Sequence, residues 1–394
     1  MTAQRKKGIF KLTAIVLGIL VLLTVLYMLL TETQFMQFAK GENTLEYEKD
    51  ILEFEMLSNT YIGVNNQQII KITKDGIMAY DLQGQELWSD TLTLDNYVVK
   101  ERESYIAIAD KMGQTIWIFN DKGKQGQVVC DNPIAYFSVN KDGNVAVIES
   151  LDESHVIGAY NKNGESFSKR ITYAKDAVYP TTVELSPNND ILLASYVNVD
   201  APVITSTLIA MKTQKPKEEK LDDILYGIEQ KDNLIYEIEF IKDNEWVSVG
   251  DKTTAWYTLE GSEIGRKTEL FCLLNPYLVK KSNYGEGFLP VISTMSINKN
   301  TLHRKSSLTF YNAKGNAFFS EELDEEPTYS YADDKGIILG SGNHFIGYNK
   351  IGTKLFEYNA SIDVSKLFYL RDKKKALAVT RDKVILLNTK KEEK

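Results

Sequence analysis

The chain has 394 residues, of which 43% are hydrophobic and 11% aromatic, and its formal net charge is −8. This composition is typical of a folded protein and excludes a largely disordered one. Four of the 46 basic residues and none of the 54 acidic residues lie in the first 30 positions, so the rest of the chain is strongly acidic. Phosphate backbones repel such a surface, and we expect no nucleic-acid partner.

The N-terminal sequence predicts a membrane anchor. Residues 1–11 form a short basic tail, and residues 12–30, LTAIVLGILVLLTVLYMLL, carry no charge. As a helix they span about 28 Å, close to the thickness of the hydrocarbon core. Basic residues before this segment and Glu32 after it predict a cytoplasmic N-terminus. The alternative is a cleaved signal peptide, but its apolar region is typically only ~7 to 15 residues and is followed by small residues.

We therefore predict a single-pass protein of the cell membrane with an extracytoplasmic body. Residues 31–50 are polar and predict a juxtamembrane stalk, and the first strand-like segment is ILEFEML at 51–57. From residue 51 to residue 394 the chain repeats one hairpin, an apolar run followed by a glycine turn and a second short strand. An aromatic residue precedes the glycine by four positions at Tyr80/Gly84, Phe119/Gly123, Tyr160/Gly164, Tyr257/Gly261, Tyr311/Gly315 and Tyr348/Gly352.

The spacing of these hairpins predicts the fold. The aromatic positions recur every 37 to 54 residues, except for one interval of 97 that Met211 divides, and Leu387 continues the series. Eight such units match the period of four-stranded propeller blades. We predict an all-β, eight-bladed β-propeller after one transmembrane helix, with seven blades as the alternative. The last unit supplies only three strands, so we expect strand 51–57 to complete it and close the ring, because open ends would expose unpaired edges.

The sequence offers no catalytic, cofactor-binding or metal-binding residues. His155, His303 and His344 lack carboxylate or cysteine neighbours at metal-ligand spacing. No nucleophile elbow, phosphate-binding loop or calcium loop is present. Cys130 and Cys272 fall in different repeats, and we expect both to be buried free thiols.

One enlarged unit gathers basic residues in this acidic chain. A candidate partner-binding loop contains Lys280, Lys281, Lys299, His303, Arg304 and Lys305. Such a loop suits an anionic wall polymer, lipid headgroups or an acidic protein, although most charged loops are only solvated.

The segment GIMAYDLQGQELW resembles the repeat of quinoprotein-type propellers, in which a strand reading A-x-D precedes a glycine turn and a tryptophan. The turns NKDGN at 140–144 and SPNND at 186–190 are similar to those of WD40-like repeats. The whole layout resembles an uncharacterised family of single-pass, membrane-anchored propeller proteins of Gram-positive bacteria. The resemblance implies the fold and assigns no activity. Later units lose the tryptophan, so no quinone-binding residue is carried over.

Three functions remain open. The leading hypothesis is a non-enzymatic scaffold that binds another envelope protein or a wall polymer. The alternative is an extracytoplasmic hydrolase, lyase or quinoprotein-like oxidoreductase with its site at the channel mouth; acids, His or Arg converging there would favour it. The third is a ligand sensor, ranked last because the cytoplasmic tail is so short. The sequence does not predict the oligomeric state, nor whether the body faces a periplasm or a thick wall.

Overall fold

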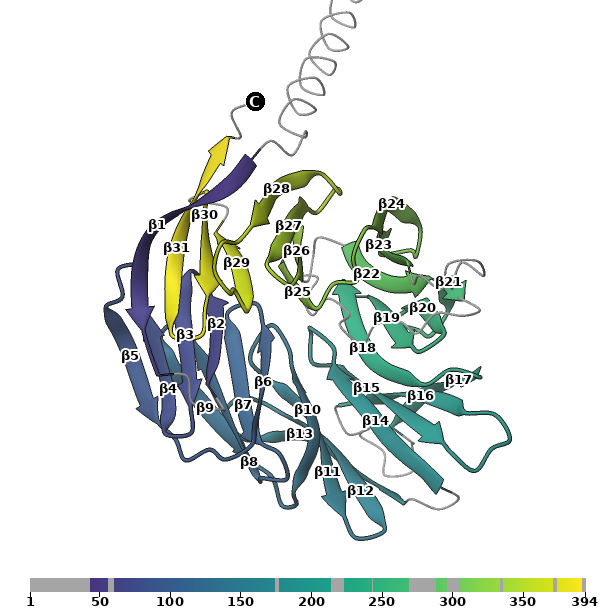
Figure 1. Cartoon of the computed structure of the whole chain (residues 1–394). Coiled ribbons are helices and arrows are strands. Elements are labelled where there is room, and N and C mark those ends of the chain that lie inside the picture. Colours follow the sequence, from purple (N-terminus) through teal and green to yellow (C-terminus); the bar gives the residue numbers. More distant parts are fainter. Residues whose placement is uncertain are drawn as a thin grey trace, which may run out of the picture.

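The computed structural model describes residues 43–55, 60–173, 177–213, 223–242, 244–268, 288–295, 305–333, 336–370 and 374–391. Within these ranges the chain forms eight antiparallel sheets, seven of four strands and one of three, arranged as the blades of a ring (Figure 1). The prediction of an eight-bladed β-propeller is confirmed, and the seven-bladed alternative is wrong.

The strands follow one another blade by blade. Blade 1 has β2 (Tyr61–Asn65), β3 (Gln68–Thr73), β4 (Gly76–Tyr80) and β5 (Glu86–Thr91); blade 2 has β6 (Tyr97–Arg102), β7 (Tyr105–Asp110), β8 (Thr115–Asn120) and β9 (Gly123–Val129). Blade 3 has β10 (Ile134–Val139), β11 (Val145–Leu151), β12 (Ser154–Tyr160) and β13 (Ser166–Tyr173); blade 4 has β14 (Val178–Leu185), β15 (Ile191–Asn198), β16 (Thr205–Lys212) and β17 (Ile224–Lys231). Blade 5 has β18 (Ile235–Lys242), β19 (Glu245–Gly250), β20 (Thr253–Thr258) and β21 (Glu263–Thr268); blade 6 has β22 (Phe288–Met295), β23 (Lys305–Asn312) and β24 (Ala317–Leu323). Blade 7 has β25 (Tyr329–Asp333), β26 (Gly336–Ser341), β27 (His344–Asn349) and β28 (Lys354–Asn359); blade 8 has β29 (Lys366–Leu370), β30 (Lys375–Val379), β31 (Lys383–Lys391) and, from the N-terminus, β1 (Asn43–Glu53).

The N-terminal strand completes the last blade. β1 pairs antiparallel with β31 along its whole length, from Asn43 opposite Lys391 to Glu53 opposite Lys383. It begins eight residues before the predicted strand 51–57, so the predicted stalk at 31–50 is wrong over its last eight residues. The outer strand of a blade is largely solvated. The first eight residues of β1, NTLEYEKD, are therefore charged and resemble a polar linker in the sequence.

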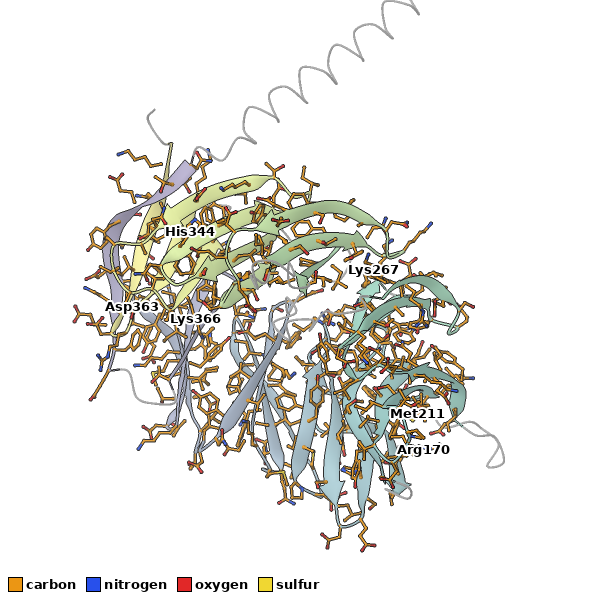
Figure 2. The ribbon with its side chains drawn as sticks, turned by 45° about the vertical axis from the view of Figure 1, so that its right-hand side comes forward. Arg170, Met211, Lys267, His344, Asp363 and Lys366 are labelled. Carbon is orange, nitrogen blue, oxygen red and sulfur yellow. The ribbon has the colours of Figure 1, made fainter. Side chains whose placement is uncertain are left out.

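Each pair of neighbouring blades shares a buried hydrophobic cluster, and Figure 2 shows side chains filling the space between the sheets. Eight such clusters occur among the described residues, one for every neighbouring pair, including blades 8 and 1. The cluster that joins these two blades packs Leu377 and Leu386 against Ile69. Each buried aliphatic side chain contributes roughly 1.5 to 3 kcal/mol, so ring closure is stabilised by hydrophobic burial as well as by strand pairing.

The second and third strands are buried on both faces, as their continuous apolar sequences predict. In β7, for example, Ile106, Ala107, Ile108 and Ala109 are all at most 1% exposed. A sheet with one solvated face would alternate apolar and polar residues, whereas a blade is covered on both sides by its neighbours.

The glycine turns have the conformation that the sequence predicts. Gly84, Gly123, Gly164, Gly261, Gly315 and Gly352 all have φ between +76° and +96°. L-residues avoid this left-handed region, so the turns require glycine. At Gly84 a Cβ atom would also lie 2.3 Å from the Ile51 carbonyl oxygen of the neighbouring blade.

Because each blade is an antiparallel meander, its connections divide between two faces of the ring. The turn from second to third strand and the exit from the fourth strand lie on one face, here called the connection face. The glycine turns between third and fourth strands lie on the other, the glycine face. β1 is a fourth strand, so it begins on the glycine face.

Blade 6 has three strands among the described residues, and residues 269–287, which precede β22, lie outside the described ranges. The Tyr311/Gly315 turn lies between β23 and β24, as the equivalent turns lie between third and fourth strands elsewhere. β22 is therefore a second strand.

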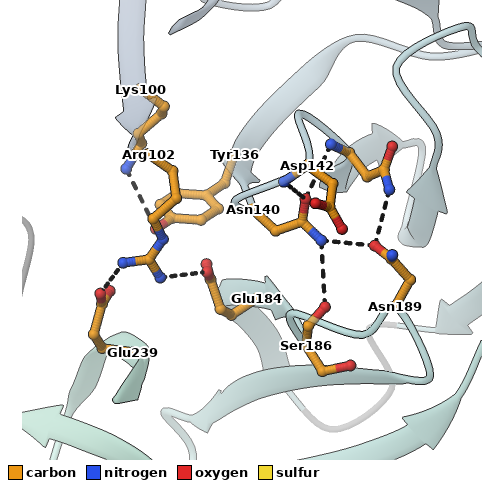
Figure 3. Close-up of polar contacts among 10 residues, drawn as sticks. Lys100, Arg102, Tyr136, Asn140, Asp142, Glu184, Ser186, Asn189 and Glu239 are labelled. Atoms are coloured by element: carbon orange, nitrogen blue, oxygen red, sulfur yellow. Dashed lines mark hydrogen bonds and ion pairs between the residues drawn. The ribbon is translucent and has the colours of Figure 1, made fainter. Parts of the chain in front are cut away.

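The NKDGN and SPNND turns join blades 3 and 4. The side-chain amide of Asn140 donates to Asn189 Oδ1 at 2.6 Å and to the Ser186 carbonyl oxygen at 3.3 Å, and Asn144 Nδ2 donates to the same Asn189 oxygen at 2.9 Å (Figure 3). The two motifs are structural, and they fix the blades relative to each other on the glycine face.

The described part of the chain contains no helix with the length and apolarity that crossing a bilayer requires. The predicted tail at 1–11 and the predicted anchor at 12–30 lie outside the described residues.

Candidate functional site

The predicted basic loop is almost entirely outside the described residues. Five of its residues are not described: Lys280, Lys281, Lys299, His303 and Arg304. Lys305 is the first residue of β23. The loop stays a prediction, and the described residues instead present two other features, a charged central cavity and an apolar surface patch.

The central cavity has a volume of about 300 Å³ and lies where first strands converge. Its described lining comes from seven of them, β2, β6, β10, β14, β18, β25 and β29. It includes four carboxylates, Glu101, Glu184, Glu237 and Glu239, and three cations, Lys100, Arg102 and Lys366. It also includes five aromatic rings, Tyr61, Tyr136, Tyr329, Tyr331 and Phe368. The size is at the lower end of the range for small-molecule sites.

One side chain bridges the cavity. Arg102, at the end of β6 in blade 2, donates from Nη2 to Glu184 Oε1 of blade 4 at 3.1 Å, and its Nη1 donates to Glu239 of blade 5 (Figure 3). The side chains of Arg102 and Glu184 are only 7% and 6% exposed. A buried charge needs a charged or hydrogen-bonding partner. These three residues therefore act as a clamp between the first strands of blades 2, 4 and 5.

Burial and repulsion between carboxylates raise the pKa of one residue of this clamp. Burial raises the pKa of Glu184 to about 8, with Arg102 opposing the rise and Glu239 adding to it. Burial works against the Arg102 guanidinium, but Glu239 and Glu184 outweigh it and raise the pKa of Arg102. One guanidinium therefore serves two carboxylates, and Glu184 holds a proton near neutral pH.

The two lysines of the cavity lie over tyrosine rings. Lys366 Nζ is 4.4 Å from the centroid of the Tyr61 ring and donates to the Ile62 carbonyl oxygen at 3.1 Å. Tyr61 in turn donates its hydroxyl to Glu101 at 2.9 Å. Burial lowers the pKa of Lys366, with Glu101 opposing this effect.

Lys100 makes the second such contact. Its Nζ is 4.5 Å from the centroid of the Tyr136 ring and 3.3 Å from the Tyr136 hydroxyl. Burial, and then Glu237, raises the pKa of Tyr136. Cation–π contacts of this kind hold both lysines in place.

Sequence reasoning missed this site, although a signal for it exists. The second and third strands of the blades are apolar, whereas several first strands carry charges, as in YVVKER at 97–102 and IYEIEFIK at 235–242. Charges in an otherwise apolar repeat indicate the strand that borders the channel. Their convergence follows only from ring closure, since Arg102 and Glu239 are 137 positions apart.

The second feature is an apolar patch on the connection face. Eight of the fourteen large hydrophobic side chains that are exposed among the described residues lie on this face in blades 2, 3 and 4. They are Met112, Val129, Leu151, Ile171, Tyr179, Val199, Val203 and Ile204, between 39% and 59% exposed. We call these residues the blade 2–4 patch. Single exposed hydrophobic residues are ordinary, and eight of them on one face of three successive blades make this face the candidate interaction surface.

Hydrogen bonds connect the loops that carry the patch. The Val199 amide donates to the Ala177 carbonyl oxygen at 3.2 Å, which joins the second–third turn of blade 4 to the start of its first strand. Across the boundary between blades 3 and 4, the rings of His155 and Tyr179 meet edge to face at 6.3 Å. These contacts connect the segments of blades 3 and 4 that carry patch residues.

Within the described ranges, no group of three or more His, Cys, Asp or Glu side chains is arranged to hold a metal ion. Cys130 is a buried free thiol, as predicted, and burial raises its pKa to about 12. Cys272 lies outside the described residues.

Three solved propellers illustrate the structural similarity. BamB from Moraxella catarrhalis is 11% identical, with a TM-score of 0.47 over 86% of this chain and 98% of that one. Hsv2 from Kluyveromyces lactis is 12% identical (TM-score 0.45, 85% and 99%), and the Pan2 WD40 domain of Neurospora crassa is 8% identical (TM-score 0.44, 76% and 89%). Similarities of this size carry no information on ligands or partners, and the propeller assignment rests on the strand topology and the core clusters.

The comparison with curated proteins found no match. A family model described as a family of unknown function, DUF5711, matches residues 35–387, which is most of the chain.

Proposed function

The chain belongs to the family of unknown function DUF5711, and we propose that it is a membrane-tethered, extracytoplasmic scaffold that binds a partner protein through the blade 2–4 patch. The observation that carries this proposal is the gathering of eight exposed hydrophobic side chains on one face of three successive blades. Burying such side chains against a partner releases about 25 cal/mol per Å² of apolar surface.

The patch favours a protein over the other predicted partner, a wall polymer. Apolar side chains gain nothing from an anionic or strongly hydrated polymer, whereas protein interfaces have an apolar core. The acidic excess of the chain after residue 30 would also repel an anionic polymer.

The connection of the N-terminal segment fits a tethered scaffold. β1 begins on the glycine face, and its first residue, Asn43, pairs with Lys391 near the C-terminus. A helix at 12–30 would therefore hold the ring from the glycine face, leaving the connection face and its patch directed away from the bilayer. The uncharged segment and the basic tail before it support this part of the proposal.

Site-specific crosslinking tests the partner surface. A photoreactive phenylalanine replaces Ile171 or Val203 of the patch in the full-length chain in living cells. The matched control replaces Ile351, which is 50% exposed in the glycine turn of blade 7. We expect one discrete protein adduct from both patch positions and none from Ile351. Adducts from all three positions, or from none, would contradict the proposal.

A charge in the patch provides the second arm. Ile171→Asp is expected to reduce the adduct formed at Val203 at least tenfold, because burial of an unpaired carboxylate in an interface is costly. Ile351→Asp leaves it unchanged. For the location, Ile351→Cys on the glycine face, in a chain whose Cys130 and Cys272 are replaced by alanine, is expected to react with a membrane-impermeant maleimide in intact cells. Reaction only after lysis would refute the extracytoplasmic placement.

The central cavity favours the second candidate function, an enzyme. Carboxylates and an arginine do converge there, which is the arrangement named above as favouring that hypothesis. However, Arg102, Glu184 and Glu239 bind one another, which makes them a clamp. Turnover of a small molecule that is lost in a cavity variant and retained in Ile171→Asp would establish this function instead.

A further inference from the structure

We propose that the central cavity is a binding site for a small organic primary amine, with the ammonium group held between the carboxylates of β14 and β18 and the aromatic wall of β25 and β29. This site is separate from the blade 2–4 patch, and a ligand here is independent of the partner protein proposed above.

The charges of the cavity carry the first step. Its described lining has four carboxylates and three cations, and all three cations already have partners on the protein. Arg102 bonds to Glu184 and Glu239, while Lys100 and Lys366 lie over Tyr136 and Tyr61. With every group ionised, the described lining carries one net negative charge, so the described residues favour an added cation over an added anion.

The acidic excess has a definite location. Glu184 of β14 and Glu237 and Glu239 of β18 lie on the side of blades 4 and 5, and the cations near them, Arg102 and Lys100, both come from β6. Three carboxylates therefore share two cations on this side. On the side of blades 8 and 1, Lys366 and Glu101 balance each other.

Burial, and then the neighbouring carboxylates Glu239 and Glu237, raises the pKa of Glu184, with Arg102 opposing the rise. The Glu184 carboxyl faces Arg102, Glu239 and Glu237, and Ser138 of β10 lies beside it. A proton on this carboxyl relieves the cost of burying its charge and its repulsion by the neighbouring carboxylates. A ligand ammonium group provides the same charge, so its binding releases that proton and the bound carboxylate accepts a hydrogen bond from the amine.

The aromatic wall provides the second half of the site. Tyr329 and Tyr331 of β25 and Phe368 of β29 line the cavity, and the rings of Tyr331 and Phe368 meet edge to face at 4.9 Å. Aromatic faces attract ammonium groups, more strongly when the contact is desolvated, and they pack against the carbon frame of the ligand. Neither carboxylates nor rings alone distinguish an amine from other cations, but together they favour an organic one.

Two pairs of probes that differ only in an ammonium group test the proposal. Glucosamine is compared with glucose, and benzylamine with benzyl alcohol, by calorimetry on the full-length chain in neutral detergent. We expect at least one amine to bind at least tenfold more tightly than its hydroxyl partner. For benzylamine, whose ammonium group stays protonated over this range, affinity should rise between pH 6 and pH 8, with proton release detected as a dependence of the binding heat on buffer.

Variants place the site. Glu237→Gln keeps the three clamp residues and is expected to weaken amine binding at least fivefold, as is Tyr331→Leu. Glu153→Gln, in the exposed turn between β11 and β12, is the matched control and leaves binding unchanged. Equal binding of amines and alcohols, absence of binding by both amines, or equal loss in Glu153→Gln would overturn the proposal.

Discussion

The clamp in the central cavity gives the sharpest test of the fold. Replacing Arg102 by methionine keeps most of the side-chain volume and removes the charge that Glu184 and Glu239 share. Both carboxylates are then left in a cavity where their side chains are 6% and 15% exposed. Removing one partner from a buried ion pair typically costs about 3 to 5 kcal/mol.

The expected change in melting temperature follows from the size of the ring. With an unfolding entropy of ~2.1 cal/mol/K per residue, the propeller between β1 and the end of β31 has roughly 0.7 kcal/mol/K. If the closed ring unfolds as one unit, a loss of ~4 kcal/mol lowers the melting temperature by roughly 5 °C. Scanning calorimetry of the full-length chain measures this shift.

A second variant separates a lost charge from a lost contact. Arg102→Met combined with Glu184→Leu and Glu239→Leu removes all three charged groups, and apolar replacement of a buried charge cluster is often neutral or stabilising. We expect the triple variant to melt within about 2 °C of the natural chain. A triple variant as unstable as Arg102→Met, or an Arg102→Met variant of unchanged stability, would refute the clamp.

Three further predictions concern stability. Glu184→Gln should flatten the pH dependence of urea unfolding: the folded chain holds the Glu184 proton more tightly than the unfolded chain, so the natural protein loses stability as pH rises from about 5 to about 8 and the variant loses less. Leu45 in β1 is 4% exposed, so Leu45→Ala should lower the free energy of unfolding by about 2 to 3 kcal/mol. Tyr47 is 60% exposed, so Tyr47→Ala should lower it by less than about 0.5 kcal/mol in the same denaturation assay. Equal effects would mean that β1 does not cover the core. At Gly84 the φ is +83° and an added Cβ would meet a backbone oxygen of β1, whereas at Gly342 it would meet nothing within 4 Å. Gly84→Ala should therefore destabilise the ring by at least ~1 kcal/mol more than Gly342→Ala. The reverse order of melting temperatures would contradict the packing of this turn.

The repeat could be recognised in the sequence because each of these turns requires a glycine at a fixed position. Each aromatic residue four positions before a glycine marks the end of a third strand, and each of these glycines has a positive φ. The apolar continuity of the second and third strands follows from burial on both faces. Even the two units without the glycine signal, at Met211 and Leu387, were placed correctly, since β16 and β31 are the third strands of blades 4 and 8.

The start of β1 and the central cavity were harder to predict from the sequence. An outer strand has a solvated edge, so Asn43–Asp50 carries charges that resemble a linker, and only the buried Leu45 indicates its strand character. The clamp joins β6, β14 and β18, whose charges meet only after the ring has closed. Local patterns contain strand signals and turn signals, but they do not contain the curvature that brings distant first strands together.

The closed ring is the central claim, because the position of the tether, the patch and the cavity all depend on it. A pair of cysteines at positions 46 and 388, which lie opposite each other in the β1–β31 ladder, tests it directly in a full-length chain whose Cys130 and Cys272 are replaced by alanine. The control pair, at positions 46 and 383, is separated along the strand, since Lys383 lies opposite Glu53. We predict that Glu46→Cys/Asn388→Cys forms a disulfide within one chain under mild oxidation and that Glu46→Cys/Lys383→Cys does not. Free thiols in both pairs, or a disulfide only between chains, would contradict the closed ring.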